Sequence, residues 1–311
     1  MSGGGRRSLY LGLAAVAAMA WLPAAGPAYY LQLLTIIFYW IGLAACWNLM
    51  CGYTGYIDFG SAAYTGIGAY VAGLLMLRLG LPLLATIPLA GLGAGLVALA
   101  VGWPTLRLRG AYFAIATFAL AEALMRVCEE WSGLTEGGVG ITIPQRLAEL
   151  SYYWLYLGLA GLLVGVTWWV EHHKHGYGLK AIHQDEQAAA QVGVDTHLIK
   201  LQTYVTSAFF IGMLGALEGS RLGYFKPDDV FNVHITIKMV IMSLLGGMGT
   251  VLGPVIGASF LQLVEDFLGA RFLNYYLVII GAIIVGVIVF LPRGITGSLR
   301  QRLRIRPGRR P

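Results

Sequence analysis

Long apolar segments separated by short polar ones make up most of the chain. A helix needs about 20 apolar residues to cross the hydrocarbon of a membrane, and most segments approach that length. None shows the two-residue alternation typical of a lipid-facing strand. The pattern predicts an all-α integral membrane protein with about ten transmembrane or re-entrant helices. The expected spans are residues 8–25, 29–50, 59–77, 83–105, 110–127, 152–170, 200–221, 235–249, 252–268 and 273–291.

Two of these segments leave alternatives open. Segment 235–249 is short enough to be either a crossing or a re-entrant helix. The first apolar segment follows Arg6 and Arg7 and has an alanine-rich centre, so it resembles a signal peptide. We predict that it is retained as the first span, because its removal would leave nine crossings and conflict with the expected topology.

One internal polar interval, residues 171–199, separates two of the expected spans. Within it, the Ala188–Ala190 run lies between Gly178 and Gly193. Alanine has the highest intrinsic helix propensity and glycine often ends helices, so the interval predicts a short helix. A short helix held in water between two spans is well placed to be bound by a soluble partner.

The positive charges of the loops gather on one predicted face of the membrane. With ten crossings, that face carries Arg6, the interval 171–199 and the basic tail 292–311, together with Arg107 and Arg109. The positive-inside rule then places this face and both termini in the cytoplasm. The opposite face receives the acidic residues Glu129, Glu130, Glu136, Asp228 and Asp229, and Arg78 is the exception.

Composition excludes a soluble protein. Hydrophobic residues make up 58% of the chain and charged residues only 12%, whereas charged residues approach about 25% in soluble domains. We therefore treat residues 1–311 as a single transmembrane domain in contact with lipid. The net charge of +6 is concentrated at the two ends, which argues for membrane orientation and against a nucleic-acid partner.

Two glycine-rich stretches, residues 52–70 and 246–257, interrupt the apolar pattern in the two halves of the chain. Both are typical of broken helices, whose freed backbone groups can line a cavity between the two halves of an internal repeat. Their similarity is limited to glycine spacing. Close packing of helices is the alternative explanation for these glycines.

Few residues suggest chemistry. Asp58 is predicted either to cap the third span or to take part in a translocation pathway. Glu122 and Arg126 lie four residues apart on the fifth span and are expected to form an ion pair, or else to line a polar pathway. The closely spaced His172, His173 and His175 are interpreted as polar residues at a membrane exit rather than as metal ligands. The sequence has no phosphate-binding loop and no catalytic arrangement, so we expect no ATPase activity and no bound cofactor or metal.

Several motifs together resemble the membrane permease subunits of ABC importers for branched-chain amino acids, in particular the LivM type. The resemblance covers nearly the whole chain. The matching stretches are Asn48–Gly55, Phe59–Gly60, Gly66–Tyr70, Leu106–Thr117, Leu134–Ile141, Gly178–Val194, Leu245–Pro254 and Pro292–Gly294.

The resemblance implies an ABC importer permease fold in which the polar interval docks on a cytoplasmic ATPase. The segment Gln187–Gly193 keeps the spacing of the family's coupling-helix pattern, with Gln187 where that pattern has glutamate. The implied coupling residues are Leu179, Lys180, Asp185, Glu186, Gln187, Ala188, Ala189 and Gly193. The implied pathway residues are Asn48, Tyr53, Thr54, Asp58, Ser61, Glu122 and Arg126, although Asp58 and Ser61 depart from many relatives.

The resemblance also implies partners and a location. The partners are two cytoplasmic ATPases that use ATP and Mg, a related permease or a second copy of this chain, and an extracytoplasmic substrate-binding protein. The location is the cytoplasmic (inner) membrane of a prokaryote. The alternatives are an ABC permease for urea or a short amide and an ion-coupled secondary transporter that works without an ATPase.

Overall fold

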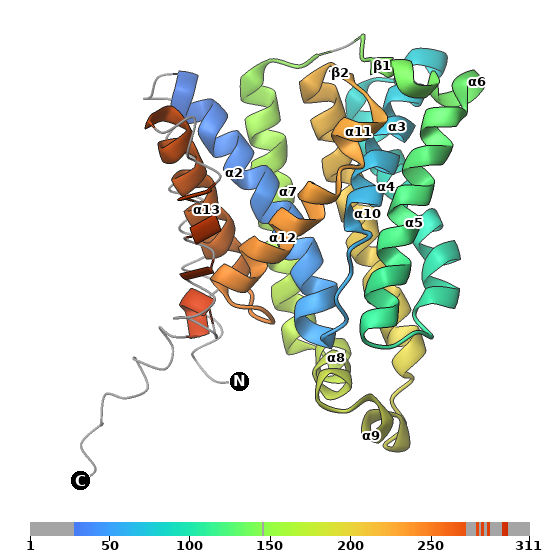
Figure 1. The fold of residues 1–311 in the computed structure, drawn as a ribbon, viewed down its shortest axis with the longest axis vertical. Helices are drawn as coiled ribbons and strands as arrows, with labels where there is room; N and C mark the ends of the chain where they lie inside the picture. The colour runs from blue at the N-terminus through green and yellow to red at the C-terminus, as the bar shows by residue number, and fades with distance from the viewer. Residues whose placement is uncertain are drawn as a thin grey trace.

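The computed structural model describes residues 28–144 and 146–271, together with the pieces 278–279, 281–282, 285–286 and 294–297. This part of the chain is almost entirely helical (Figure 1). The expected first span and most of the expected last span lie outside the described residues, as do Arg6, Arg7 and most of the basic tail. Eight of the ten expected spans fall within the described residues, and seven of these coincide with helices long and apolar enough to cross a membrane. The expected span 252–268 is not among the seven, so the count of about ten is not confirmed.

Seven stretches of the described chain are long and apolar enough to cross a membrane. They make this part of the chain a multi-pass, all-α membrane protein, with only two strands of two residues each. The elements in order are α2 (Ala28–Trp47), η2 (Asn48–Gly52), α3 (Ser61–Leu79), α4 (Leu83–Thr105), α5 (Ala111–Glu130), α6 (Ser132–Thr135), η3 (Gly137–Val139), β1 (Ile141–Thr142), α7 (Glu149–His172), α8 (Lys174–Gln184), α9 (Glu186–Gln191), α10 (Thr196–Leu222), β2 (Tyr224–Phe225), α11 (Pro227–Val230), α12 (Val233–Gly246) and α13 (Gly253–Arg271).

The predicted boundaries are close to the observed ones where a local signal is present in the sequence. Helix α4 coincides with the expected span 83–105 and begins directly after Pro82. Helix α10 begins at Thr196, four residues earlier than expected. The reason is an N-cap, because the Asp195 carboxylate accepts a hydrogen bond from the Leu198 N–H at 3.0 Å.

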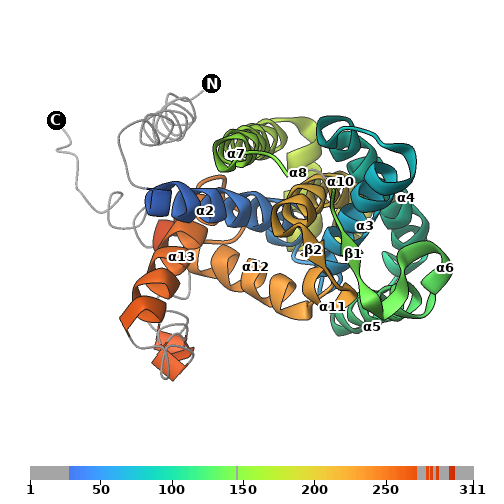
Figure 2. The same ribbon diagram turned by 90° about the horizontal axis from the view of Figure 1, so that it is seen from above.

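The 27-residue helix α10 lies at the centre of the fold. Seen from above, it lies between α2 and α7 on one side and α3 and α4 on the other (Figure 2). Small residues allow this close packing: a methyl group built on Gly68 of α3 would lie 2.1 Å from the Gly212 carbonyl oxygen of α10. Close approach through glycine is typical of helix interfaces in membranes, where apolar burial alone gives little preference between neighbours.

The described loops fall into two groups at opposite ends of the helices (Figure 1). At one end, α8 and α9 lie beside the α4–α5 loop, where Arg109 Nε is 3.6 Å from a Glu186 carboxylate oxygen. At the other end, β1 and β2 pair antiparallel and hold the acidic loops together. This grouping agrees with the charge pattern of the sequence. The exception, Arg78, lies at the acidic end, where its guanidinium donates to the carbonyl oxygens of Gly133 and Leu134 at 2.9 and 3.0 Å.

Helix α12 is shorter than a membrane crossing. Its 14 residues rise about 21 Å at 1.5 Å per residue, against a hydrocarbon thickness of about 30 Å. It reaches the length of a span only together with α11, as the stretch Pro227–Gly246. The chain turns at 247–252 and continues as α13, which packs back against α12. The second glycine-rich stretch is thus a helix break, as predicted.

Candidate functional site

The polar interval forms a hairpin of two helices, α8 and α9, where the sequence predicts one helix from about residue 179 to 192. The break occurs at Asp185, whose backbone is extended at φ −160°. Its carboxylate accepts hydrogen bonds from the N–H groups of Gln187 and Ala188 at 2.8 and 3.1 Å and so caps α9. Gly178, expected to precede the helix, lies inside α8 and packs closely against Ile199.

The predicted coupling residues divide into exposed and buried groups. Leu179 and Ala189 are buried within the chain, and Leu179 packs with Leu49, Tyr53 and Val170. They therefore hold the hairpin to the membrane domain. Lys180 is partly buried near Glu171, with the two charged groups 3.4 Å apart. The surface left for a partner contains Asp185, Gln187, Ala188, Gly193 and two residues that sequence reasoning missed, Tyr177 and Val192.

Tyr177 and Val192 are 65% and 79% exposed. Large apolar side chains exposed beside a polar surface often mark a contact with another protein.

Glu186 does not lie on the exposed surface with its neighbours. Its carboxylate accepts hydrogen bonds from Lys200 Nζ at 2.6 Å and from the Tyr56 hydroxyl. Burial alone would raise the pKa of this carboxyl group, but the hydrogen bonds from Lys200 and Tyr56 outweigh burial and hold the pKa below its usual range. Sequence reasoning missed Tyr56 and placed Lys200 at the start of the expected span 200–221; Lys200 is buried.

The first glycine-rich stretch is also a helix break, and the two breaks lie against each other. Helix α2 ends in the π-helical turn η2, and residues 55–60 then run outside any helix to α3. The Asn48 side-chain amide donates to the Thr250 carbonyl oxygen at 3.1 Å and accepts from the Gly249 N–H at 2.8 Å. A methyl group on Gly52 would lie 2.7 Å from the Gly249 nitrogen. Both predicted uses of these glycines, helix breaks and close packing, therefore occur together, and an internal repeat stays a prediction.

Asp58 lies two residues before the N-cap of α3, so the prediction that it caps this span is wrong. The residue at the N-cap position is Gly60, and the Asp58 carboxylate accepts from the Gly60 N–H at 2.8 Å and from the Ser61 hydroxyl at 2.5 Å. The Asp58 carbonyl oxygen accepts from Trp47 Nε1 at 2.9 Å. Asp58 therefore fixes the turn between the extended loop and α3.

Five of the predicted pathway residues are buried within the chain, and the other two lie on α5. Asn48, Tyr53, Thr54, Asp58 and Ser61 are all buried within the chain, at 2% exposure or less. On α5, the expected ion pair between Glu122 and Arg126 is wrong: the Arg126 guanidinium instead contacts Glu129 at 2.5 Å. Residues 126 and 129 are three apart, which also brings side chains together on a helix.

The three closely spaced histidines bind neighbouring groups of the chain. The rings of His172 and His173 lie against Trp168 and Trp169, one turn earlier in α7. His175 Nε2 is 2.8 Å from Thr203 Oγ1 on α10, and burial lowers the pKa of His175. Within the described residues, no group of three or more His, Cys, Asp or Glu side chains is arranged to hold a metal ion.

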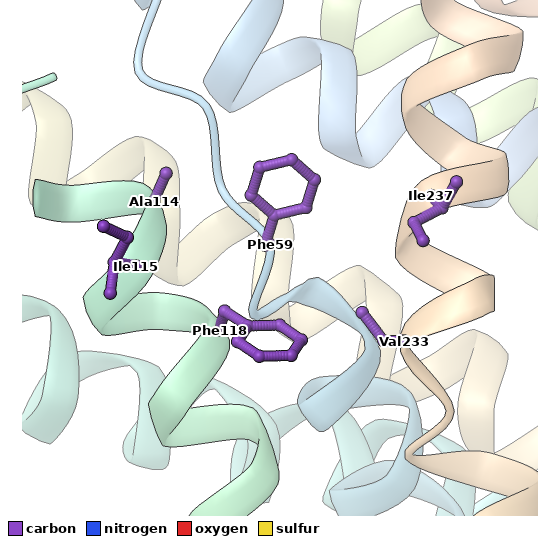
Figure 3. A pocket seen from close by; sticks show the side chains of 6 residues that line it. All are labelled: Phe59, Ala114, Ile115, Phe118, Val233 and Ile237. Carbon is purple, nitrogen blue, oxygen red and sulfur yellow. The ribbon is translucent and has the colours of Figure 1, made fainter. Parts of the chain in front are cut away.

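An apolar cavity of about 480 Å³ opens between the extended loop, α5 and α12. Phe59 of the loop projects into it between the two helices (Figure 3). The Phe59 N–H donates to Thr117 Oγ1 of α5 at 3.2 Å, which fixes the loop beside that helix. The other lining residues are Ala114, Ile115, Phe118, Val233 and Ile237. Sequence reasoning placed none of these six residues in the pathway.

Comparison with known proteins gives one family. The family model described as "branched-chain amino acid transport system / permease component" matches residues 29–288. The high-affinity branched-chain amino acid transport system permease protein LivM of Escherichia coli K12 is 29% identical over 88% of this chain and 71% of its own length. LivH of Salmonella typhimurium LT2 is 23% identical over 82% of this chain and 90% of its own length.

A further relative, the autoinducer 2 import system permease protein LsrC of Salmonella paratyphi B, is 27% identical over 80% of this chain and 73% of its own length. No solved structure matches the chain.

Proposed function

Because the chain belongs to the family of permease components of branched-chain amino acid transport systems, we propose that it forms half of the pore of an ATP-driven importer for branched-chain amino acids. As an ABC-type permease subunit, it transports and is not itself an enzyme. The observation that supports the proposed mechanism best is the exposed α8–α9 hairpin, which contacts both α10 and the extended loop at 55–60.

In the proposed mechanism, two cytoplasmic ATPases bind ATP and Mg, and this hairpin docks on the ATPases. The permease chain itself binds neither ATP nor Mg. Closure of the ATPases moves the hairpin, and the two adjoining helix breaks let the membrane segments change direction. A motion of this kind can be driven only by contacts that differ in free energy between the open and closed states. The exposed Asp185, Gln187, Ala188, Tyr177 and Val192 are the proposed docking residues.

The solute is proposed from the relatives, since LivM and LivH are named for branched-chain amino acids. LsrC, named for autoinducer 2 import, indicates that similar permeases serve unlike solutes. We therefore propose that an extracytoplasmic substrate-binding protein supplies most of the selectivity. The proposed location is the cytoplasmic membrane of a prokaryote, with both termini in the cytoplasm and a related permease, or a second copy, as the other half of the pore.

The experiment is reconstitution in proteoliposomes with a related permease, two ATPases and a substrate-binding protein. We expect leucine uptake that requires ATP on the ATPase side. Uptake of urea in place of leucine would overturn the proposed solute. Uptake driven by an ion gradient without the ATPases would overturn the class and favour a secondary transporter.

Docking of the hairpin is tested separately by co-purification of the ATPases. Ala188→Trp adds bulk at an exposed position of α9, and we expect it to abolish co-purification. The matched control is Val139→Trp, because Val139 is 73% exposed at the opposite end of the molecule. Equal recovery of ATPase with both variants would contradict the assignment of the docking surface.

A further inference from the structure

Lys200, near the start of α10, joins three segments that are distant in the sequence. The residue is 2% exposed. Its ammonium group donates to the Tyr56 hydroxyl at 3.1 Å, to the Leu106 carbonyl oxygen at 3.1 Å and to the Glu186 carboxylate at 2.6 Å. These three acceptors match the three N–H donors of a lysine. They belong to the extended loop before α3, to the end of α4 and to the start of α9.

Glu186 completes a closed set of contacts. Its carboxylate accepts from both Lys200 and the Tyr56 hydroxyl and also lies 3.6 Å from Arg109 Nε. A buried charge is costly when its partner is removed, because the remaining charge has lost its solvent and its counter-ion. The first residue of α9 therefore cannot move away from α10 and the loop without leaving Lys200 and Glu186 unpaired.

A second contact joins the hairpin to the same loop. At Gly55 the backbone has φ +76°, and a methyl group built there would lie 2.7 Å from His183 Nδ1 of α8. A side chain at position 55 would thus meet both an unfavourable backbone conformation and a clash. The loop therefore lies close to α8 at residue 55 and is hydrogen-bonded to α9 at residue 56.

The loop leads directly from these contacts to the apolar cavity. Tyr56 is two residues before Asp58, which fixes the start of α3, and three residues before Phe59, which lines the cavity. Residues 55–60 are outside any helix, so this short extended segment links hairpin and cavity wall. A displacement of α9 applied at Tyr56 can reach Phe59 directly along this short segment.

We propose that Lys200 and Glu186 are positioning residues that tie the coupling hairpin to the 55–60 loop, so that movement of the hairpin is delivered to the cavity at Phe59. The inference rests on the proposed function and adds to it the residues that carry the motion into the membrane. Neither residue needs to touch the solute or the ATPase. Loss of the tether should therefore separate ATP hydrolysis from transport while leaving docking intact.

The test uses the reconstituted importer with Lys200→Met, Glu186→Gln and the double variant. Lys174→Met is the matched control, because it removes the same charge from an exposed position of the same hairpin. The readout is the number of leucine molecules imported per ATP hydrolysed, which does not depend on how much of the protein is folded. We expect ATPase binding to persist and this ratio to fall about 5- to 150-fold, the range of typical coupling energies.

The double variant should be no worse than either single variant, because both remove the same tether. The control should keep the wild-type ratio. Ratios within about twofold of wild type in Lys200→Met and Glu186→Gln would overturn the proposal. Loss of ATPase binding in these variants would overturn it too, since the residues would then shape the docking surface instead.

A second measurement tests, in the absence of ATPase and solute, whether Lys200 and Glu186 hold the hairpin to the 55–60 loop. Spin labels are placed on the full chain at Ile57→Cys in the loop, where the native residue is 44% exposed, and at Ala188→Cys in α9, with Cys128→Ser to remove the least buried native thiol. We expect a narrow distance distribution that broadens with Lys200→Met but not with Lys174→Met. An unchanged distribution refutes the tether. If wild type fails to transport yet the distribution responds as expected, the tether stands and the proposed function fails.

Discussion

Substitution of Gly215 tests the packing of the central helix. A methyl group at this position of α10 would lie 2.1 Å from the Thr65 carbonyl oxygen and 2.9 Å from the Thr65 Cα of α3. Both neighbours are backbone atoms, which cannot rotate away. Since normal contacts between heavy atoms are about 3.5 Å, Gly215→Ala must move α3 and α10 apart by roughly 1 Å.

The expected cost follows from two opposing effects. Overpacking a tight interface destabilises by about 1–3 kcal/mol, and contact between two rigid backbones places this case at the upper end. The higher helix propensity of alanine returns up to about 1 kcal/mol. The net loss of about 2 kcal/mol corresponds to a decrease in Tm of roughly 3 °C for a chain of this size.

The assay is thermal unfolding of the purified protein in detergent, followed by tryptophan fluorescence. Gly158→Ala is the control, because a methyl group on Gly158 of α7 meets nothing within 4 Å, and its Tm should equal or exceed that of wild type. A Gly215→Ala protein as stable as the Gly158→Ala protein would refute the reasoning from interhelical contact.

Two further predictions concern the hairpin. Gly193 has φ +86° and open space around it, so Gly193→Ala should cost about 1–2 kcal/mol from backbone conformation alone; faster amide hydrogen exchange in residues 189–194 is the expected result, and unchanged protection contradicts it. The pKa of Glu186 is lower in the folded protein than its ordinary value of 4.5. Its carboxylate therefore contributes stability that is complete above the unfolded pKa and is lost as pH falls through the folded pKa. The Tm difference between wild type and Glu186→Gln should shrink on acidification below about pH 4.5; a difference that grows would contradict the assigned contacts.

The sequence predicted those features that depend on local pattern. Apolar length located the described spans, and α4 coincides with its predicted range because Pro82 marks its start. Loop charges divided the described loops between two ends, and glycine clusters located two helix breaks. Local signals also explain the error in the hairpin. The Ala-rich run favours one continuous helix, but the Asp185 side chain caps α9 and so divides the predicted helix into two.

Contacts between particular side chains could not be predicted from local pattern. From the sequence we predicted that Arg126 pairs with Glu122, whereas it contacts Glu129. Spacings of three and four residues both bring side chains together on a helix, so spacing alone does not choose between the two glutamates. Likewise, the pathway residues inferred from motifs are buried, whereas the six residues that line the apolar cavity come from three separate segments. Only the packing of the loop against α5 and α12 brings those segments together.

By itself, the sequence determined that this chain is a helical membrane protein with a polar interval among its basic loops, because hydrophobic length, charge and glycine content act locally along the chain. The tertiary structure alone decided which side chains of the hairpin are exposed and which contact the interior of the protein. Glu186 belongs to the polar interval in sequence, yet it contacts Lys200 and Tyr56 inside the protein. Its role depends on partners 14 and 130 residues away, and no spacing rule along the chain reaches that far.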